Sequence, residues 1–307
     1  GYDEVQYTTS AIGLVIDLAS STQQDGLGGV DTLANIEGVE GTQYDDQIYG
    51  TDGDNSLDGR FGNNVIDGRL GFDFVEYNGE GRAQLTVNLD AGTASFIRAS
   101  NGTGYTDSLL NIEGVVGSST ADSITGDDSD NRLYGNGGDD KIYGGGGNDL
   151  LDGGAGDDWL YGEGGDDKIY SGLGNDAVYG GAGIDSLYDT GGNDHFDGGA
   201  DGDVLSFDSV IEGHTGVVVN TTLGTATDST GGADTFINIE NFIGTDLADH
   251  FTGKDTDASI PIEYNAAGIV SDNYELFIGL AGDDFIDGKG GYDEVQYTTS
   301  AIGLVID

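Results

Sequence analysis

The chain has 307 residues and a formal net charge of −48, because 57 acidic side chains stand against only 9 Lys and Arg. Such a charge repels the phosphates of nucleic acids and anionic membranes, so neither is an expected partner, and no run of eighteen apolar residues is present to span a membrane. The chain has no Cys, so no disulfide stabilises it. Its 58 glycines and high charge are typical of a disordered protein, so we expect it to fold only when something neutralises its acids.

The first predicted module covers residues 1–76. A β-branched, alternating stretch at 14–18 predicts a half-buried strand, and the signature DTLANIE follows at 31–37. Four nine-residue copies then fill 41–76. Numbering each copy one to nine, slot six holds Asp46, Asn55, Asn64 and Asp73. Since Asn offers one neutral oxygen, the copies of Asn55 and Asn64 are expected to bind a cation weakly or not at all.

The second module, residues 77–206, contains ten copies without a break. A strand is predicted at 85–89 and the signature DSLLNIE stands at 107–113; the copies occupy 117–206. Glycine recurs at slots one, two and four, slot six holds Asp in all copies but one, and slot eight holds a large apolar residue in every copy. Slot six holds Asp122, Asn131, Asp140, Asp149, Asp158, Asp167, Asp176, Asp185, Asp194 and Asp203. Slot eight holds Ile124, Leu133, Ile142, Leu151, Leu160, Ile169, Val178, Leu187, Phe196 and Leu205.

The third module, residues 207–290, has degenerate copies. A strand is predicted at 217–220, the signature DTFINIE stands at 234–240, and one copy with Asp249 in slot six follows. Ala258 takes the next slot six, and Glu275 keeps only a trace of the pattern, so cation binding there is left open, as it is at Asn131. Two further copies in register have Asp284 and Asp293 in slot six.

Residues 291–307, GYDEVQYTTSAIGLVID, repeat residues 1–17 letter for letter. Chance does not produce a seventeen-residue identity, so we interpret the chain as one 290-residue unit followed by the start of the next. Asp3 then occupies the same slot six as Asp293. A longer tandem array is predicted.

The spacing has a physical meaning. Each copy is a six-residue turn followed by a three-residue strand, in which slot eight faces one way and slots seven and nine the other. Two copies form an 18-residue coil, and coils stack about 4.8 Å apart as parallel strands. We therefore predict an all-β fold, a parallel β-roll or β-solenoid, with wider β-coils between the blocks of copies.

Stacking brings the slot-six carboxylates into columns. Two charges about 4.8 Å apart repel by roughly 3.5 kcal/mol at an effective dielectric of 20, so the columns need cations. Ca²⁺ accepts six to eight oxygen ligands and mixes carboxylates with backbone carbonyls, whereas Mg²⁺ demands tighter octahedral geometry. The predicted cofactor is Ca²⁺, in several copies, and folding should be coupled to its binding.

The pattern G-G-x-G-x-D-x-U-x, where U is a large apolar residue, resembles the RTX (repeats-in-toxin) family of secreted calcium-binding proteins. The resemblance implies export by type I secretion, an extracellular or cell-surface location and folding on extracellular calcium. The residues predicted to bind the metal are Asp3, Asp46, Asp73, Asp122, Asp140, Asp149, Asp158, Asp167, Asp176, Asp185, Asp194, Asp203, Asp249, Asp284 and Asp293.

No enzyme activity is expected. The three histidines, His195, His214 and His250, form no zinc motif, Cys is absent as a nucleophile, and no glycine run has the Lys-Ser/Thr of a phosphate loop. Two functions remain: a structural repeat of a large adhesin, sheath, S-layer-like coat or filament, or the secretion and folding appendage of a type I-secreted enzyme or toxin. Tandem identity favours the structural repeat.

Aromatic residues at outward positions are the last feature. Tyr143, Tyr161 and Tyr179 occupy slot nine of alternate copies, and Trp159 lies two residues before Tyr161. They form either a cross-strand ladder that stabilises the sheet or a contact surface for other copies of the chain or a cell-surface polysaccharide.

Overall fold

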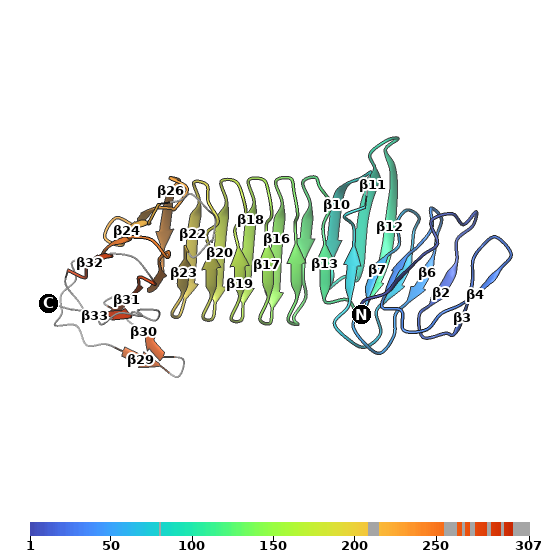
Figure 1. The fold of residues 1–307 in the computed structure, drawn as a ribbon, viewed down its shortest axis with the longest axis horizontal. Coiled ribbons are helices and arrows are strands. Elements are labelled where there is room, and N and C mark those ends of the chain that lie inside the picture. Colours follow the sequence, from blue (N-terminus) through green and yellow to red (C-terminus); the bar gives the residue numbers. More distant parts are fainter. Residues whose placement is uncertain are drawn as a thin grey trace. The chain divides into compact units, whose positions relative to one another are not determined.

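The computed structural model of the chain describes residues 1–79, 81–207, 215–254, 263–265, 268–270, 274–280, 284–289 and 292–296. It divides into two compact units, Gly1–Gly145 and Gly146–Asp307, and every regular element in the described residues is a strand (Figure 1). The predicted all-β parallel roll is confirmed. The module boundaries stay predictions, and Ala258, His214 and residues 297–307 lie outside the described residues.

Unit 1 contains two sheets whose strands alternate along the chain. The first has, in spatial order, β1 (Glu4–Gln6), β5 (Gly38–Glu40), β7 (Ser56–Asp58), β9 (Phe74–Glu76), β13 (Gly114–Val116) and β15 (Arg132–Tyr134). The second has β2 (Val15–Asp17), β6 (Gln47–Tyr49), β8 (Val65–Asp67), β12 (Thr103–Leu110), β11 (Thr93–Arg98), β10 (Arg82–Asn88), β14 (Ser123–Thr125) and β16 (Lys141–Gly146). A separate hairpin joins β3 (Thr22–Gln24) and β4 (Val30–Thr32).

Unit 2 repeats this plan. Its first sheet has β17 (Leu150–Asp152), β19 (Lys168–Tyr170), β21 (Ser186–Tyr188), β23 (Val204–Ser206), β27 (Asn241–Ile243), β31 (Tyr274–Ile278) and β33 (Tyr292–Gln296). Its second has β18 (Trp159–Gly164), β20 (Ala177–Ala182), β22 (His195–Ala200), β26 (Ala233–Ile237), β25 (Thr225–Thr227), β24 (Val218–Asn220), β28 (His250–Thr252) and β32 (Phe285–Asp287). A small hairpin joins β29 (Glu263–Asn265) and β30 (Gly268–Val270).

The register between neighbouring nonapeptide strands is 18 residues, so equivalent slots meet. Ile169 pairs with Leu187 in one sheet, and Leu160 pairs with Val178 in the other. All ten slot-eight residues of the second module have no solvent-exposed area, which confirms that slot eight faces inward. Each such side chain contributes roughly 1.5–3 kcal/mol by burial. One apolar residue per copy therefore suffices for a core once the coils stack.

The strand-like passages between the blocks widen the coils by antiparallel insertions. In unit 1, β10, β11 and β12 form an antiparallel meander; β12 pairs in parallel with β8, and β10 pairs in parallel with β14. The β11–β12 hairpin extends beyond the neighbouring strands in Figure 1. In unit 2, β24, β25 and β26 form the same kind of insertion between β22 and β28. Both meanders begin and end in the parallel register of the roll.

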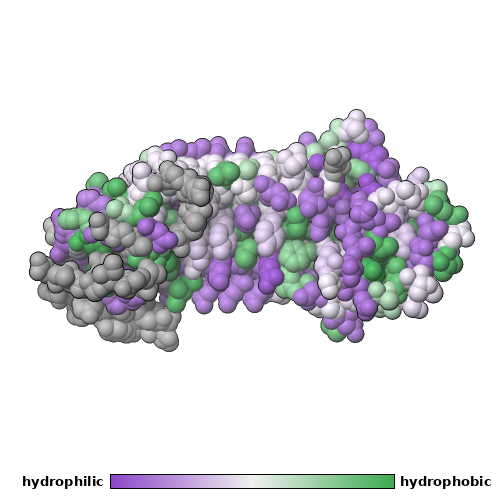
Figure 2. Space-filling model, viewed as in Figure 1, coloured by the Kyte–Doolittle hydropathy of each residue, from purple (hydrophilic) through white to green (hydrophobic). Residues whose placement is uncertain are grey.

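Hydrophilic and near-neutral residues dominate the visible surface over the nonapeptide coils of unit 2 in Figure 2. Outward slots seven and nine carry this surface, because slot eight is buried. Among the described residues, no helix has the length and apolar character needed to cross a membrane.

Candidate metal sites

The slot-six side chains are buried in columns along the turns. In each column the backbone N–H of one slot-six residue donates to Oδ1 of the slot-six residue 18 positions later. Examples are Asp167 to Asp185 at 2.9 Å and Asp176 to Asp194 at 2.8 Å. The same bond joins Asp122 to Asp140, Asp149 to Asp167, Asp158 to Asp176 and Asp185 to Asp203. One carboxylate oxygen of each residue is thereby fixed by the neighbouring coil.

The second oxygen, Oδ2, is different. It is buried and has no hydrogen-bond partner in a set of slot-six residues, namely Asp73, Asp167, Asp176, Asp185, Asp194 and Asp203. A buried acceptor without a partner costs about 1–3 kcal/mol. A row of such oxygens is unfavourable for the protein alone and suits a cation that accepts oxygen ligands.

Glycine at slot one makes room for this arrangement. Gly180 does not have a positive φ, so its backbone would accept a side chain, but a Cβ there would lie closer than 3.0 Å to Asp185 Oδ2 and to the Gly198 carbonyl oxygen. Gly162 stands in the same relation to Asp167 and Gly180. Two kinds of oxygen, carboxylate and backbone carbonyl, thus converge where a methyl group would otherwise sit. This mixture is the ligand set that Ca²⁺ prefers.

The electrostatics agree with the geometry. Burial, and then the neighbouring carboxylates, raise the pKa of Asp203 to about 8 and of Asp167 to about 7. For Asp176 the same causes raise the pKa to about 8. Ionised carboxylates are therefore unfavourable in these columns near neutral pH unless a cation compensates. Bound Ca²⁺ would supply that compensation, held by Oδ2 atoms and turn carbonyls.

The copies whose slot-six Oδ2 has no partner form a first class. In a second class, both oxygens of the slot-six carboxylate accept hydrogen bonds from the protein. Asp46 Oδ2 accepts the N–H of Thr42 at 2.7 Å, while its Oδ1 accepts the Thr42 hydroxyl at 3.0 Å and the N–H of Leu14 at 2.7 Å. Asp122 has the same partners in Ser118, and Asp249 has them in Thr245. Each of these residues belongs to the first copy of its block. Their oxygens have less need of a metal than those of the first class.

The backbone at slot two separates the two classes. Slot two has a positive φ in the copies of Asp73, Asp167, Asp176, Asp185 and Asp203, even where it is Arg69 or Glu163. Thr42, Ser118 and Thr245 do not have a positive φ, and their N–H groups donate to slot six instead. Asp194 is the exception: its Oδ2 has no partner, although Thr190 in slot two does not have a positive φ. A positive φ at slot two, which glycine adopts most readily, therefore provides the turn in which Oδ2 has no partner.

The two Asn copies of the first module are satisfied without a metal. Asn64 Nδ2 donates to the Gly59 carbonyl at 3.2 Å, and Asn64 Oδ1 accepts the N–H of Asp46 at 2.9 Å. Asn55 Nδ2 donates to the Glu37 carbonyl at 3.2 Å, and Asn55 Oδ1 accepts the N–H of Thr51 at 2.6 Å. The amide nitrogen takes the place of the second oxygen and donates to a turn carbonyl. These contacts support the prediction of weak or empty sites there.

The remaining predicted residues differ in burial. Asp3 is exposed on the first coil, and its N–H donates to Glu37 Oε2 at 2.9 Å. Asp293, identical to it by sequence, is half-buried beside Glu275, and its Oδ1 has no hydrogen-bond partner. Asp284 Oδ1 accepts the N–H of Asp249 at 3.0 Å. Whether these residues bind calcium stays a prediction.

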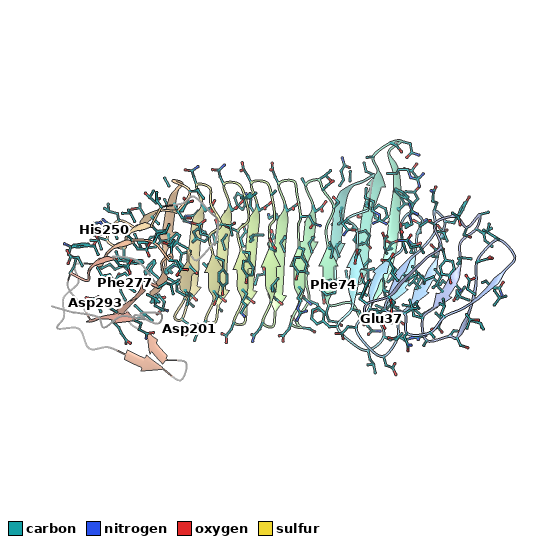
Figure 3. The ribbon with its side chains drawn as sticks, viewed as in Figure 1. Glu37, Phe74, Asp201, His250, Phe277 and Asp293 are labelled. Carbon is teal, nitrogen blue, oxygen red and sulfur yellow. The ribbon has the colours of Figure 1, made fainter. Side chains whose placement is uncertain are left out.

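Sequence reasoning missed five acids that continue the columns through the signatures. Glu113 and Glu240 accept the N–H of Asp73 and Asp203 at 3.0 and 3.1 Å, and Glu37, labelled in Figure 3, accepts that of Asp3. In the other sheet, Asp107 and Asp234 accept the N–H of the preceding slot-six residues, Asn64 and Asp194. The signal was in the spacing, since each acid stands two residues before a buried apolar residue, as in a nonapeptide.

The slot-nine tyrosines of unit 2 lie where the pattern predicted, and two histidines lie at other outward positions. In unit 2, Tyr161 stacks on Tyr179 with ring centroids 4.8 Å apart, which confirms a cross-strand ladder at these positions. His195 Nδ1 lies 2.9 Å from Thr235 Oγ1, and His250 is exposed with its ring against Phe285. Both histidines stand outside the columns of carboxylates.

Parallel coils with buried carboxylates over glycine turns define a calcium-binding β-roll. A family model that describes four copies of the RTX calcium-binding nonapeptide repeat matches residues 40–75, 116–151, 143–178, 173–205 and 276–295. The chain is an RTX-type calcium-binding repeat protein and binds Ca²⁺ at multiple sites. Repeats of this kind are typical of secreted proteins. No curated protein matches the chain.

The two classes of slot six predict different effects of the same substitution. Asp185→Asn replaces a partnerless oxygen with a donor that faces a turn carbonyl, as in Asn64, so the chain should bind at least one ion fewer and tolerate chelators better. Asp46→Asn sets an amide N–H against a backbone donor; it should keep the wild-type ion count and lose about 1–3 kcal/mol of stability. Equilibrium dialysis with elemental analysis and thermal melts measure both. Equal ion loss from the two variants would contradict the division into classes.

Proposed function

We propose that the chain is a calcium-dependent structural repeat of a large secreted or cell-surface protein, such as an adhesin, sheath, S-layer-like coat or extracellular filament. Its role is mechanical rather than enzymatic: it folds and stiffens when it meets extracellular Ca²⁺. Export would follow the type I route, with the polyanionic chain unfolded at low cytosolic calcium. Metal-coupled folding is the physical basis of this scheme.

The observation that carries the proposal is the repeated segment. In unit 1 its first copy contributes β1, which pairs with the following coil, Val5 opposite Val39. In unit 2 its second copy contributes β33, which pairs with the preceding coil, Val295 opposite Phe277 (labelled in Figure 3). A strand has two hydrogen-bonding edges, and these copies use one each. In a tandem array of 290-residue units, this strand would pair on both edges. It would join each 290-residue unit to the next without an exposed edge.

The partners we propose are other copies of the chain. Tyr161, Tyr179 and the half-exposed Trp159 form an outward aromatic surface in unit 2, and Tyr143 occupies the corresponding slot in unit 1. Such a surface on an otherwise acidic roll suits lateral contact with another roll or with a cell-surface polysaccharide.

A protein of two consecutive 290-residue units tests the proposal at the junction. Val295→Asp places a charge against Phe277 where the repeated strand joins the two units, while the exposed Glu294→Gln is the control. With calcium, the wild-type and control proteins should give single elongated particles in electron micrographs and resist protease at the junction. Val295→Asp should keep both units folded but bend and be cut between them.

A wild-type two-unit protein that flexes and is cut at the junction as readily as Val295→Asp would contradict the structural proposal. That result would favour the alternative, a secretion and folding appendage, which needs no rigid connection between units. Under chelation neither reading predicts ordered particles, so the comparison is made with calcium present.

A further inference from the structure

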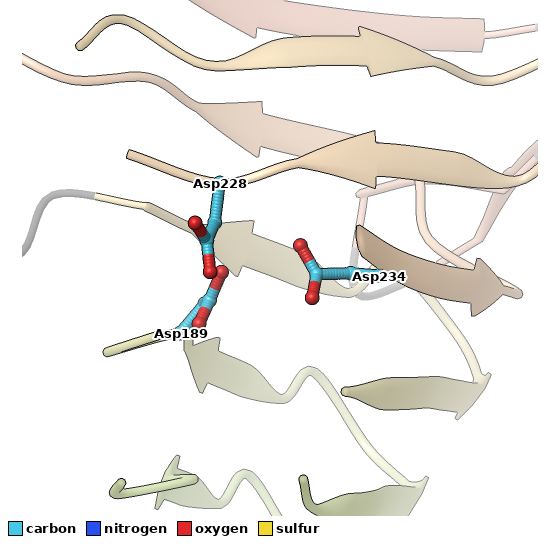
Figure 4. Close-up of side chains that lie close together, drawn as sticks. All are labelled: Asp189, Asp228 and Asp234. Atoms are coloured by element: carbon cyan, nitrogen blue, oxygen red, sulfur yellow. The ribbon is translucent and has the colours of Figure 1, made fainter. Parts of the chain in front are cut away.

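Three acids of unit 2 meet at one point, and none of them occupies slot six of a nonapeptide copy. Asp189 directly follows β21, Asp228 directly follows β25, and Asp234 lies in β26. One carboxylate oxygen from each lies within 4.8 Å of the others, and the side chains are only 2–3% exposed. Figure 4 shows the three carboxylates directed toward one another from separate elements. None of the three belongs to the predicted metal residues.

Asp189 departs from its own repeat. Slot one is Gly in every other copy of the second module except for Ser171. Asp189 Oδ1 accepts the N–H of Gly191 at 2.7 Å, which holds the side chain in a tight turn, and its Oδ2 is buried without a hydrogen-bond partner. A carboxylate has replaced the glycine and presents a second oxygen to the interior.

Asp234 presents a partnerless oxygen to the same point. Its Oδ1 accepts the N–H of Asp194 at 3.0 Å, as in the slot-six column, and its Oδ2 is buried without a partner. Burial and the nearby Asp228 and Asp194 carboxylates raise the pKa of Asp234 to about 7. Burial and the carboxylates of Asp234, Asp194 and Asp228 raise that of Asp189 to about 9.

Asp228 is held rigidly in place. Its Oδ1 accepts the Thr230 N–H at 2.7 Å, the Thr230 hydroxyl at 2.8 Å and the Gly232 N–H at 2.8 Å. Its Oδ2 accepts the Gly192 N–H at 3.2 Å. A Cβ on Gly232 would lie closer than 3.0 Å to both Asp228 Oδ2 and the Gly192 carbonyl oxygen. The turn therefore brings a backbone carbonyl close to this carboxylate.

The equivalent place in unit 1 shows how the fold neutralises an acid without a metal. Asp107 there accepts the Tyr77 hydroxyl at 3.0 Å, and Arg82 lowers its pKa against the larger effect of burial. Phe207 takes the position of Tyr77, since Phe207 donates its N–H to the end of β27 as Tyr77 does to the end of β13. Phe207 has no hydroxyl to offer Asp234, and the sequence has no Lys or Arg at 206–240.

We propose that Asp189, Asp228 and Asp234 hold one further Ca²⁺, at the point where the slot-six column continues from Asp194 to Asp234 in the insertion. A cation at 2.3–2.6 Å from each ligand spans oxygens up to about 5 Å apart, which the trio satisfies, and a buried all-oxygen set suits Ca²⁺ better than the strongly hydrated Mg²⁺. The ion ties the β24–β26 insertion to the turn of the ninth copy. It fixes in place a segment whose strands are otherwise short.

The number of ions bound tests this site, and it does not depend on how the units assemble. Asp189→Asn keeps the Oδ1 bond to Gly191 and removes one ligand oxygen; Asp189→Gly restores the glycine of the other copies. Each full-chain variant should retain the wild-type circular dichroism in calcium and bind one Ca²⁺ fewer by equilibrium dialysis with elemental analysis. The insertion at 218–237 should also exchange its amide hydrogens faster.

Asp166→Asn is the control, since it removes one exposed carboxylate from a turn of the same block at the other edge of the roll, three copies before that of Asp189. It should keep the wild-type ion count and exchange pattern. The site is refuted if both Asp189 variants bind as many ions as the wild type with unchanged affinity. A matching loss in Asp166→Asn would also overturn it, because the effect would then follow total charge rather than this cluster.

Discussion

In excess chelator at neutral pH the chain is expected to lose its β-sheet circular-dichroism signal, and to regain it cooperatively when calcium is restored. Unit 2 alone buries partnerless oxygens in Asp167, Asp176, Asp185, Asp189, Asp194, Asp203 and Asp234. At about 1–3 kcal/mol each they cost roughly 7–21 kcal/mol. That cost is comparable with the roughly 5–15 kcal/mol by which folded proteins are stable. The cation therefore decides whether the roll exists.

The same prediction has a pH dependence of known sign. The folded pKa values of Asp167, Asp176 and Asp203 lie at about 7 to 8, above the value of about 3.9 for an unfolded chain. The metal-free roll therefore takes up protons that the unfolded chain does not, and its free energy of unfolding rises as the pH falls from about 8 toward about 4. With chelator present, the β signal should be larger near pH 5 than near pH 8.

Calcium reverses this trend, because protons compete for the same oxygens. With calcium present, the concentration needed for half-maximal β signal should rise as the pH falls. A chelated chain that keeps its full β signal at pH 8 would contradict the account, since the buried carboxylates would then be tolerated without a cation.

The second large effect is expected from Gly180→Ala. The added methyl group would lie closer than 3.0 Å to Asp185 Oδ2 and to the Gly198 carbonyl oxygen, where the two kinds of calcium ligand converge. Neither neighbour is a flexible chain end, so we expect at least one ion fewer per chain and a loss of about 1–3 kcal/mol from overpacking. Calcium titration monitored by circular dichroism and elemental analysis measure both.

Gly53→Ala is the matched control. It is also a turn glycine of a nonapeptide, but a Cβ there would have Thr51 Oγ1 at 3.9 Å as its nearest neighbour. It should bind the wild-type number of ions and change stability by no more than about 0.5 kcal/mol. If Gly180→Ala bound as many ions as the wild type, glycine at slot one would not be needed to leave room for the metal.

The period of the nonapeptide made most of the roll predictable. Slot eight is the one large apolar position in each copy, and an 18-residue coil is the arrangement that buries it on both sheets, as Ile169 and Leu160 show. The antiparallel path of β10–β12 was not predictable in this way. Alternating residues indicate a half-buried strand but do not say which neighbour it pairs with, because pairing order is set by contacts distant in sequence.

For the metal sites, the residue type at slot six was readable but its surroundings were not. Asp46 and Asp185 have the same letter in the same slot, yet Thr42 satisfies the first and a glycine turn leaves the second with a free oxygen. The difference lies in slot two, whose backbone conformation the pattern does not state. Glu113 was missed because a longer acid reaches the column from a segment without the repeated glycines.

The two antiparallel insertions have a consequence for how such chains diversify. β12 rejoins the roll in register with β8, and β10 offers the next coil, β14, the same three-residue template. The residues between those contact points do not take part in the pairing with the coils on either side. An insertion can therefore lengthen, shorten or acquire a new surface loop while the pairing between the coils stays unchanged. Each insertion can thus be exchanged for another without altering the roll.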